Sequence, residues 1–136
     1  MTRTIVTSPE VHHFVVDGQL APYSPAVALD APRRLLFISG QVAVSADGAV
    51  VGKNDIQAQT KQALRNIAAL LTSAGASWDD VIKTTVFIAD PSLFPGYLAA
   101  RREFMHGDPP SSTAVVAPPV NPDYLIEIEA IAALAD

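Results

Sequence analysis

The sequence predicts an α+β domain in which a mixed β-sheet carries two helices on one face. Two stretches with the apolar spacing of helices, one from Asn54 to Gly75 and one from Ser92 to Gly107, each lie between apolar runs typical of strands. A helix between two strands crosses over one face of their sheet. With 136 residues, of which 49% are hydrophobic, the chain is expected to fold as a single domain spanning residues 1–136.

The N-terminal third has the weaker pattern. Residues 1–20 alternate only weakly and indicate an edge strand or a tail lying over the body. Residues 26–30 and 35–44 are expected to pair as a β-hairpin, followed by a short strand at residues 49–51. Gly40 interrupts the second strand of this hairpin, and a glycine there is typical of a close approach by a ligand or another backbone.

Capping and stop residues bound the first helix. Asn54 is expected to cap its N-terminus, with Gln57 three residues on as in a capping box, and Gly75 is expected to end it. The positions that recur at helical spacing are Ile56, Thr60, Ala63, Ile67, Leu71 and Ala74.

The run from Val81 to Ala89 is apolar on both faces, as expected of a central strand. Residues 90–92 are then expected to cap the second helix. Arg101 and Arg102 lie on this helix, and we expect both at the surface, which is the usual place for charged side chains.

Residues 109–133 indicate two strands joined by a proline-rich turn. Successive side chains of a strand point to opposite faces, so Glu127 and Glu129 share one face of the second strand, and the other face is apolar. The carboxylates share their face with Leu125 and Ile131. A carboxylate among bulky apolar side chains is a candidate for site chemistry. The alternatives are a solvated face and carboxylates paired with an arginine across a subunit contact.

The face of the sheet away from the helices is left uncovered by the rest of the chain. It still carries large apolar side chains, namely Phe37, Phe87, Leu125 and Ile131. Such patches mark interaction surfaces, so we expect a closed homo-oligomer in which the sheets of neighbouring subunits meet.

Charge and segment patterns narrow the choice of partners. Lys and Arg number 9 against 14 Asp and Glu, and the net charge of −5 argues against a nucleic-acid partner, because binding phosphates needs a basic surface. No run has the apolar length of a signal peptide or a membrane span, so we expect a cytoplasmic protein without a membrane partner. His12, His13 and His106 show no metal-ligand spacing, and we expect no metal or other cofactor.

Several blocks of the chain resemble the RidA family, also called YjgF/YER057c/UK114. Residues 21–25, Ala-Pro-Tyr-Ser-Pro, are similar to its Gly-Pro-Tyr segment, and residues 37–41, Phe-Ile-Ser-Gly-Gln, to its Ser-Gly-Gln strand. Residues 81–87 resemble its central strand and residues 126–132 its C-terminal signature. The resemblance implies a chorismate-mutase-like fold, a homotrimer, and deamination of enamines or imines in a cleft between subunits.

The resemblance also implies which residues form the cleft. Glu127 matches the family's carboxylate, which positions the attacking water. Tyr23 and Ser39 match residues that line the cleft, and backbone groups near Ala114 match those that hold the substrate. The structural alternatives are an interface plug for Tyr23 and a satisfied hydroxyl for Ser39.

The chain departs from the family's deaminases at Ser112. An ungapped match backwards from Glu127 puts Ser112 where those enzymes have an arginine that binds the substrate carboxylate. A guanidinium offers a carboxylate two charge-assisted hydrogen bonds, whereas a serine hydroxyl offers one neutral donor. Ser112 and Thr113 therefore stand as weaker candidate ligand donors, and a standard 2-imino acid is not the expected substrate.

Two functions are compatible with this pattern. The first is a hydrolase that deaminates a reactive enamine, imine or related small metabolite at clefts between subunits. The alternative is a non-catalytic homotrimer that binds a small-molecule ligand in the same clefts. Some relatives are described as ribonucleases or translation inhibitors, but the acidic balance of this chain disfavours that function.

Overall fold

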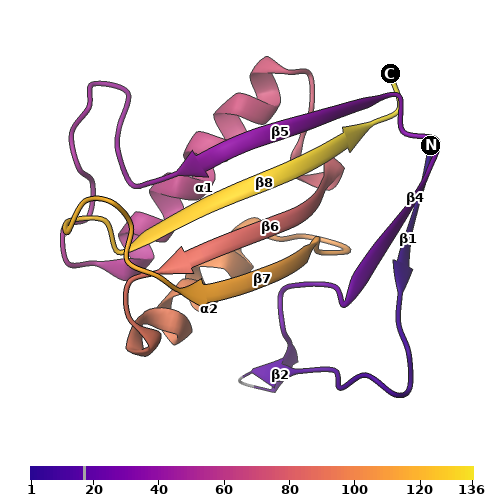
Figure 1. Ribbon diagram of the computed structural model, residues 1–136, viewed down its shortest axis with the longest axis horizontal. Coiled ribbons are helices and arrows are strands. Elements are labelled where there is room, and N and C mark those ends of the chain that lie inside the picture. Colours follow the sequence, from indigo (N-terminus) through magenta and orange to yellow (C-terminus); the bar gives the residue numbers. More distant parts are fainter. Residues whose placement is uncertain (17) are drawn as a thin grey trace.

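A four-stranded mixed β-sheet forms the centre of the molecule, and both helices lie on one of its faces (Figure 1). The computed structural model describes residues 1–16 and 18–136. In the sheet, β5 (Arg34–Gln41), β8 (Ile126–Leu134), β6 (Val81–Ile88) and β7 (Ser111–Val116) follow one another in that order. Strand β6 pairs with β8 antiparallel and with β7 parallel. The predicted α+β class, with helices on one side only, is confirmed.

The two helices are α1 (Ile56–Ser73) and α2 (Phe94–Phe104), and α1 packs against α2, β5 and β8. The predicted start of α1 is wrong by one residue, because Asp55 rather than Asn54 caps the helix by accepting a hydrogen bond from a first-turn N–H. Asn54 has a φ of 62° and lies before the helix in the left-handed region. Gly75, at φ 75°, follows the end of the helix as predicted.

Strand β8 divides its side chains between the two faces of the sheet as its alternation predicts. We call the face covered by α1 and α2 the helix face and the opposite one the outer face. Ile126 and Ile128 are fully buried on the helix face, whereas Glu127 is half-buried and Glu129 exposed. The core on the helix face includes Ala63, Leu64, Ile67, Leu71, Val81, Val86, Ile88, Tyr97, Leu98, Ile126, Ile128, Ala130 and Ala132.

The first 30 residues fold differently from the prediction. Strand β4 (Ala26–Asp30) pairs antiparallel with β1 (Thr2–Val6) rather than with β5, so the predicted hairpin is wrong. This ribbon projects beside the sheet (Figure 1). Two features explain the difference. Ala31, at φ 51°, lies at the bend between β4 and β5, and Arg3 holds β1 to the body by donating hydrogen bonds to backbone oxygens of Asp79 and Asp108.

The remaining elements are short. Strands β2 (Val15–Val16) and β3 (Gln19–Leu20) form a two-residue ladder. The strand expected at residues 49–51 is reduced to a single bridge between Val44 and Val50. A 3₁₀ turn, η1 (Trp78–Asp80), leads into β6. Within the described ranges, no helix combines the length and the apolarity needed to cross a bilayer.

Asp90 caps the 3₁₀ turn η2 (Pro91–Leu93) that leads into α2. The prediction that residues 90–92 cap α2 itself is wrong, because Leu93 takes the capping position of that helix without a side-chain hydrogen bond. Two hydrogen bonds lower the pKa of the Asp90 carboxyl. The larger effect comes from the Ser92 side chain and the smaller one from the Ser92 backbone N–H. Because these hydrogen bonds favour the ionised carboxylate, they stabilise the folded state. Their contribution to the free energy of unfolding is fully present above the unfolded-state pKa and is lost as the pH falls through the folded-state pKa.

We therefore expect Asp90→Asn to lower the melting temperature at neutral pH, and we expect the difference from wild type to shrink as the pH falls through the lowered pKa of the wild-type carboxyl. Thermal unfolding followed by circular dichroism across pH measures this. Asp136→Asn, at the exposed C-terminus, serves as the control. A difference that stays constant across the pH range would contradict the assignment.

Candidate functional site

Glu127 and Ser39, two of the predicted site residues, lie on the outer face of the sheet. The Glu127 carboxylate sits against Gly40, so closely that a Cβ at position 40 would lie 2.1 Å from Glu127 Oε1. The pairing of β5 with β8 shifts register between Ile38 and Gln41, and Gly40 lies in this irregularity. The close approach that Gly40 permits is therefore that of a carboxylate side chain. Ser39, the preceding residue, is exposed.

Thr113 also lies on the outer face, at the far edge of the sheet. Its hydroxyl accepts a hydrogen bond from Lys83 Nζ at 2.9 Å. Strands β8 and β5 place Glu127 and Ser39 on one side of β6, and β7 places Thr113 on the other. The structure therefore does not bring Thr113 next to Glu127 within one chain.

Tyr23, Ser112 and Ala114 meet elsewhere, around a cavity of about 540 Å³ between α2 and β7. Aromatic and aliphatic side chains supply most of its wall. The other lining residues are Phe14, Ile88, Pro91, Phe94, Tyr97, Leu98, Val115 and Val116. Its size matches that of pockets for small molecules.

The segment at residues 21–25 is held against the start of β7, and this brings Tyr23 to the cavity. Ser24 N donates to Pro110 O at 2.9 Å, and the Ser24 hydroxyl donates to Pro109 O. Ser24 also forms a parallel bridge with Ser111. This short addition to the sheet edge explains why a tyrosine between two prolines has a defined place.

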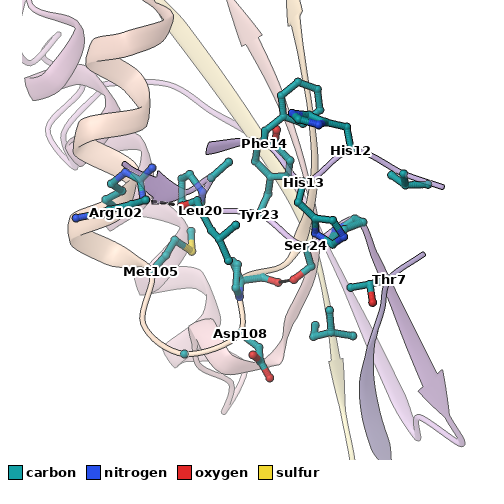
Figure 2. Close-up of a pocket in the computed structure, with 18 residues that line it drawn as sticks. Thr7, His12, His13, Phe14, Leu20, Tyr23, Ser24, Arg102, Met105 and Asp108 are labelled. Carbon is teal, nitrogen blue, oxygen red and sulfur yellow. Dashed lines mark hydrogen bonds between the residues drawn. The ribbon is translucent and has the colours of Figure 1, made fainter. Parts of the chain in front are cut away.

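A second cavity, of about 600 Å³, also has Tyr23 in its wall (Figure 2). It shares Phe14 and Tyr23 with the first cavity. Figure 2 shows His12 and Phe14 close together, and their rings meet edge to face with centroids 4.8 Å apart. In the described part of the chain, no three His, Cys, Asp or Glu side chains form a group able to hold a metal ion.

Arg101 is the residue near the first cavity that the sequence did not reveal. We expected it at the surface, and this is wrong, because Arg101 is 0% exposed. Its Nε donates to Pro22 O at 3.0 Å, and its Nη1 donates to Tyr97 Oη at 2.7 Å and to Thr84 Oγ1 at 2.9 Å. Ser112 Oγ lies 3.3 Å from the same Nη1. A guanidinium thus reaches position 112 from helix α2 instead of from strand β7.

A signal for the burial of Arg101, but not for its hydrogen-bond partners, was present in the helix pattern. Arg101 follows Leu98 by three residues, and residues three apart share a face of a helix. Leu98 is 4% exposed and packs in the core. An arginine on a core-facing stripe indicates a buried charge, whereas Arg102, one position on, is only half-buried.

Within one chain, the predicted site residues other than Thr113 therefore form two separate groups on opposite faces of the sheet. We call Ser39, Gly40 and Glu127 the carboxylate group, and Tyr23, Ser112 and Ala114 the cavity group. Ser112 belongs to the helix face because its hydroxyl contacts Arg101 of α2. Glu127 belongs to the outer face because its neighbours Ile126 and Ile128 are buried under the helices.

Comparisons with known proteins agree with this architecture. Residues 18–134 match the family described as Endoribonuclease L-PSP. A RutC family protein of Pyrococcus horikoshii is 39% identical over 113 residues, covering 83% of this chain and 87% of that protein. A 2-iminobutanoate/2-iminopropanoate deaminase of Mus musculus is 33% identical over 113 residues, covering 83% of this chain and 82% of the deaminase.

Solved structures show the same fold. A Rid family protein of unknown function from Yersinia pestis superposes with a TM-score of 0.82 at 35% identity, covering 98% of this chain and 100% of that one. The family match spans both groups of candidate residues, from Tyr23 to Glu127. The chain belongs to the RidA (YjgF) family.

Proposed function

We propose that this protein is a deaminase that hydrolyses small enamines or imines at clefts between the subunits of a homotrimer. The main observation in support of this proposal is that the candidate residues are divided between the two faces of the sheet. The carboxylate group lies on the uncovered outer face, and the cavity group opens at the edge strand β7. A neighbouring copy that covers the outer face would bring its own cavity group to the carboxylate group.

The outer face supports assembly because it exposes large apolar side chains. Phe37 is 71% exposed, Leu35 48% and Val115 41%. Exposed apolar surface of this extent marks an interaction site, and closed symmetry is the usual way for identical chains to cover it. A trimeric ring would cover this face on every subunit.

In the proposed reaction, Glu127 is the catalytic residue. Its carboxylate accepts a proton from a water molecule whose oxygen attacks the electrophilic carbon of the C=N bond, and the electron pair of that bond moves to nitrogen. The carboxyl then returns the proton to the nitrogen, which gives a neutral carbinolamine. Glu127 next takes the hydroxyl proton of this carbinolamine and passes it to the amine, so that the C=O bond forms as the C–N bond breaks and ammonia leaves. An enamine enters this sequence after tautomerising to its imine. General acid–base help of this kind contributes about 10²–10⁴-fold.

Two further properties belong to the proposal. The mouse relative named as a 2-iminobutanoate/2-iminopropanoate deaminase supports the reaction class. The net charge of −5 favours a small-molecule substrate over the nucleic-acid substrate that the family's description names. We propose that the protein works in the cytoplasm.

The experiment is a panel of imines generated in situ by an amino-acid or amine oxidase, with and without an α-carboxylate, and with ammonia or carbonyl release followed over time. Wild type is expected to accelerate release from at least one imine, and Glu127→Gln to remove most of this acceleration. Glu129→Gln, on the same face but exposed, is the matched control and should retain it. No acceleration on any substrate, together with a ligand-induced rise in melting temperature, would replace the deaminase with the non-catalytic binding protein.

A further inference from the structure

Arg101 carries a buried positive charge that no acidic side chain balances in the part of the chain that the structure describes. The oxygens to which it donates among the described residues belong to Pro22, Thr84, Tyr97 and Ser112, and all of them are neutral. Its Nη2 has no hydrogen-bond partner among residues 1–16 and 18–136. An arginine stays protonated in a protein, and buried charges are ordinarily paired. The site is therefore electrostatically suited to an anion.

Among the described residues, the carboxylates that form ion pairs do so with lysines and not with Arg101. The two ion pairs within the described ranges join Lys53 to Asp123 and Lys61 to Glu103. Glu103 is on the same helix as Arg101, but it is 58% exposed and faces Lys61. The anion that would balance Arg101 must therefore come from outside this part of the chain.

The hydrogen bonds of Arg101 direct its charge towards the 540 Å³ cavity. Arg101 donates to Thr84 Oγ1, and the Thr84 hydroxyl donates to Ser112 Oγ at 2.8 Å. Ser112 Oγ also accepts from Arg101, at 3.3 Å. A serine hydroxyl has two acceptor lone pairs and one donor hydrogen. Because both lone pairs of Ser112 are occupied, its hydrogen remains as a donor.

Ser112 and Tyr97 both line the cavity, and both accept hydrogen bonds from Arg101. Hydrogen bonds in series polarise one another, so a hydroxyl that accepts from a guanidinium becomes a stronger donor to the next group. A ligand oxygen at Ser112 would thus meet a donor backed by a full positive charge. The rest of the cavity wall is largely apolar, which suits the body of a small organic acid.

We propose that Arg101 makes this cavity selective for small carboxylates. It acts as a positioning residue, because its hydrogen bonds to the Ser112 and Tyr97 hydroxyls make these hydroxyls stronger donors to a ligand. The ligand class is a carboxylate with a compact apolar body. This inference rests on the proposed function in one respect only. If the protein is a deaminase, the carboxylate ligand would be an imine that carries a carboxylate group. The proposed selectivity reverses the expectation, drawn from Ser112 alone, that the cleft lacks an anchor for a carboxylate.

The direct test uses ligand pairs that differ only in charge. Butanoate is compared with butanamide, and benzoate with benzamide, by isothermal titration calorimetry on the wild-type protein. The carboxylate of each pair is expected to bind roughly tenfold to a hundredfold more tightly than the amide, as hydrogen bonds to a charged group imply. Equal affinities within each pair, or no binding of either member, would overturn the proposal without any mutant.

Variants of Arg101 test whether this residue produces the preference. Arg101→Leu should abolish the preference for carboxylates and leave amide affinity unchanged, whereas Arg101→Lys should retain part of it. The double variant Arg101→Leu, Ser112→Arg moves the guanidinium from α2 to β7. Its preference for carboxylates over amides should return. Arg65→Leu removes a positive charge from an exposed position on α1 and should change neither affinity.

Other outcomes separate this inference from its alternatives. If Arg101→Leu weakened carboxylates and amides equally, the residue would be merely structural and the proposal wrong. If it dissociated the oligomer and left selectivity unchanged, a carboxylate of a neighbouring subunit would be its counter-ion, and the proposal would also be wrong. Carboxylate selectivity in a wild-type protein that releases no ammonia would uphold this inference and refute the deaminase, whereas turnover without selectivity would do the reverse.

Discussion

Gly40→Ala is expected to lower imine turnover by about 10²–10⁴-fold, the contribution of general acid–base catalysis, by displacing the Glu127 carboxylate. The added methyl group would lie 2.1 Å from Glu127 Oε1 and 2.8 Å from its Cγ and Cδ. The contact involves a side chain that can swing outwards, so the fold should survive. Gly40 is not among the described residues with positive φ, and alanine therefore adds no backbone strain there.

A double-mutant cycle shows whether the effect passes through Glu127. Gly40→Ala should add little in a Glu127→Gln background, because the group that it displaces has already lost its function. Turnover of the best imine from the oxidase panel provides the rates, and thermal unfolding checks that each variant is folded. Multiplicative losses in the double variant, or full activity in Gly40→Ala, would show that position 40 does not orient the carboxylate.

Phe37→Asp is expected to convert the proposed trimer into monomers and to abolish turnover with it. Phe37 is 71% exposed on the outer face, and burying a side chain of this size contributes about 1.5–3 kcal/mol. An aspartate would lose this contribution and would place a charge in an apolar contact, once in each subunit. Analytical ultracentrifugation measures the assembly, and ammonia release measures activity on the same samples.

The matched control is Leu70→Asp, an apolar-to-acidic change on α1 where the leucine is 44% exposed. It adds the same charge on the opposite side of the sheet and should leave both assembly and turnover intact. Circular dichroism should show that Phe37→Asp retains its secondary structure, since the core lies under the helices. An unchanged sedimentation coefficient for Phe37→Asp would refute assembly through the outer face.

The sequence predicted those elements of the fold whose periodicity is strong. The alternation around Glu127 and Glu129 correctly divides β8 between a buried and an outer face, and Gly75 correctly ends α1. Such patterns are reliable because burying the apolar face of a strand or helix outweighs most local preferences. The cap of α1 was misplaced because Asn54 and Asp55 are both good capping residues, and the backbone conformation decides between them.

Pairing between distant strands was less predictable. The hairpin of residues 26–30 with residues 35–44 was wrong, because β4 pairs with β1 and β5 pairs with β8. Neighbouring strands in sequence usually pair, and the rule fails here because Ala31 bends the chain and the hydrogen bonds of Arg3 hold β1 in reach. Contacts such as that between Arg3 and Asp108, far apart in the chain, leave no periodic signal.

For the candidate site, the residue types came from the sequence and their grouping from the fold. Side-chain alternation was enough to put Glu127 beside an uncovered apolar face. It was not enough to show that Glu127 packs on Gly40, or that Ser112 belongs to the opposite face. Those facts depend on the register between β5 and β8 and on the parallel pairing of β6 with β7.

By itself, then, the sequence determined the α+β class, the helices on one side, and the uncovered face that carries a carboxylate. Only the tertiary structure decided that Arg101 occupies the space beside Ser112. The physical reason is that periodicity records which face of its own element a residue takes. The partners that a buried charge finds are set by the packing of α2 against β6 and β7, which no local pattern contains.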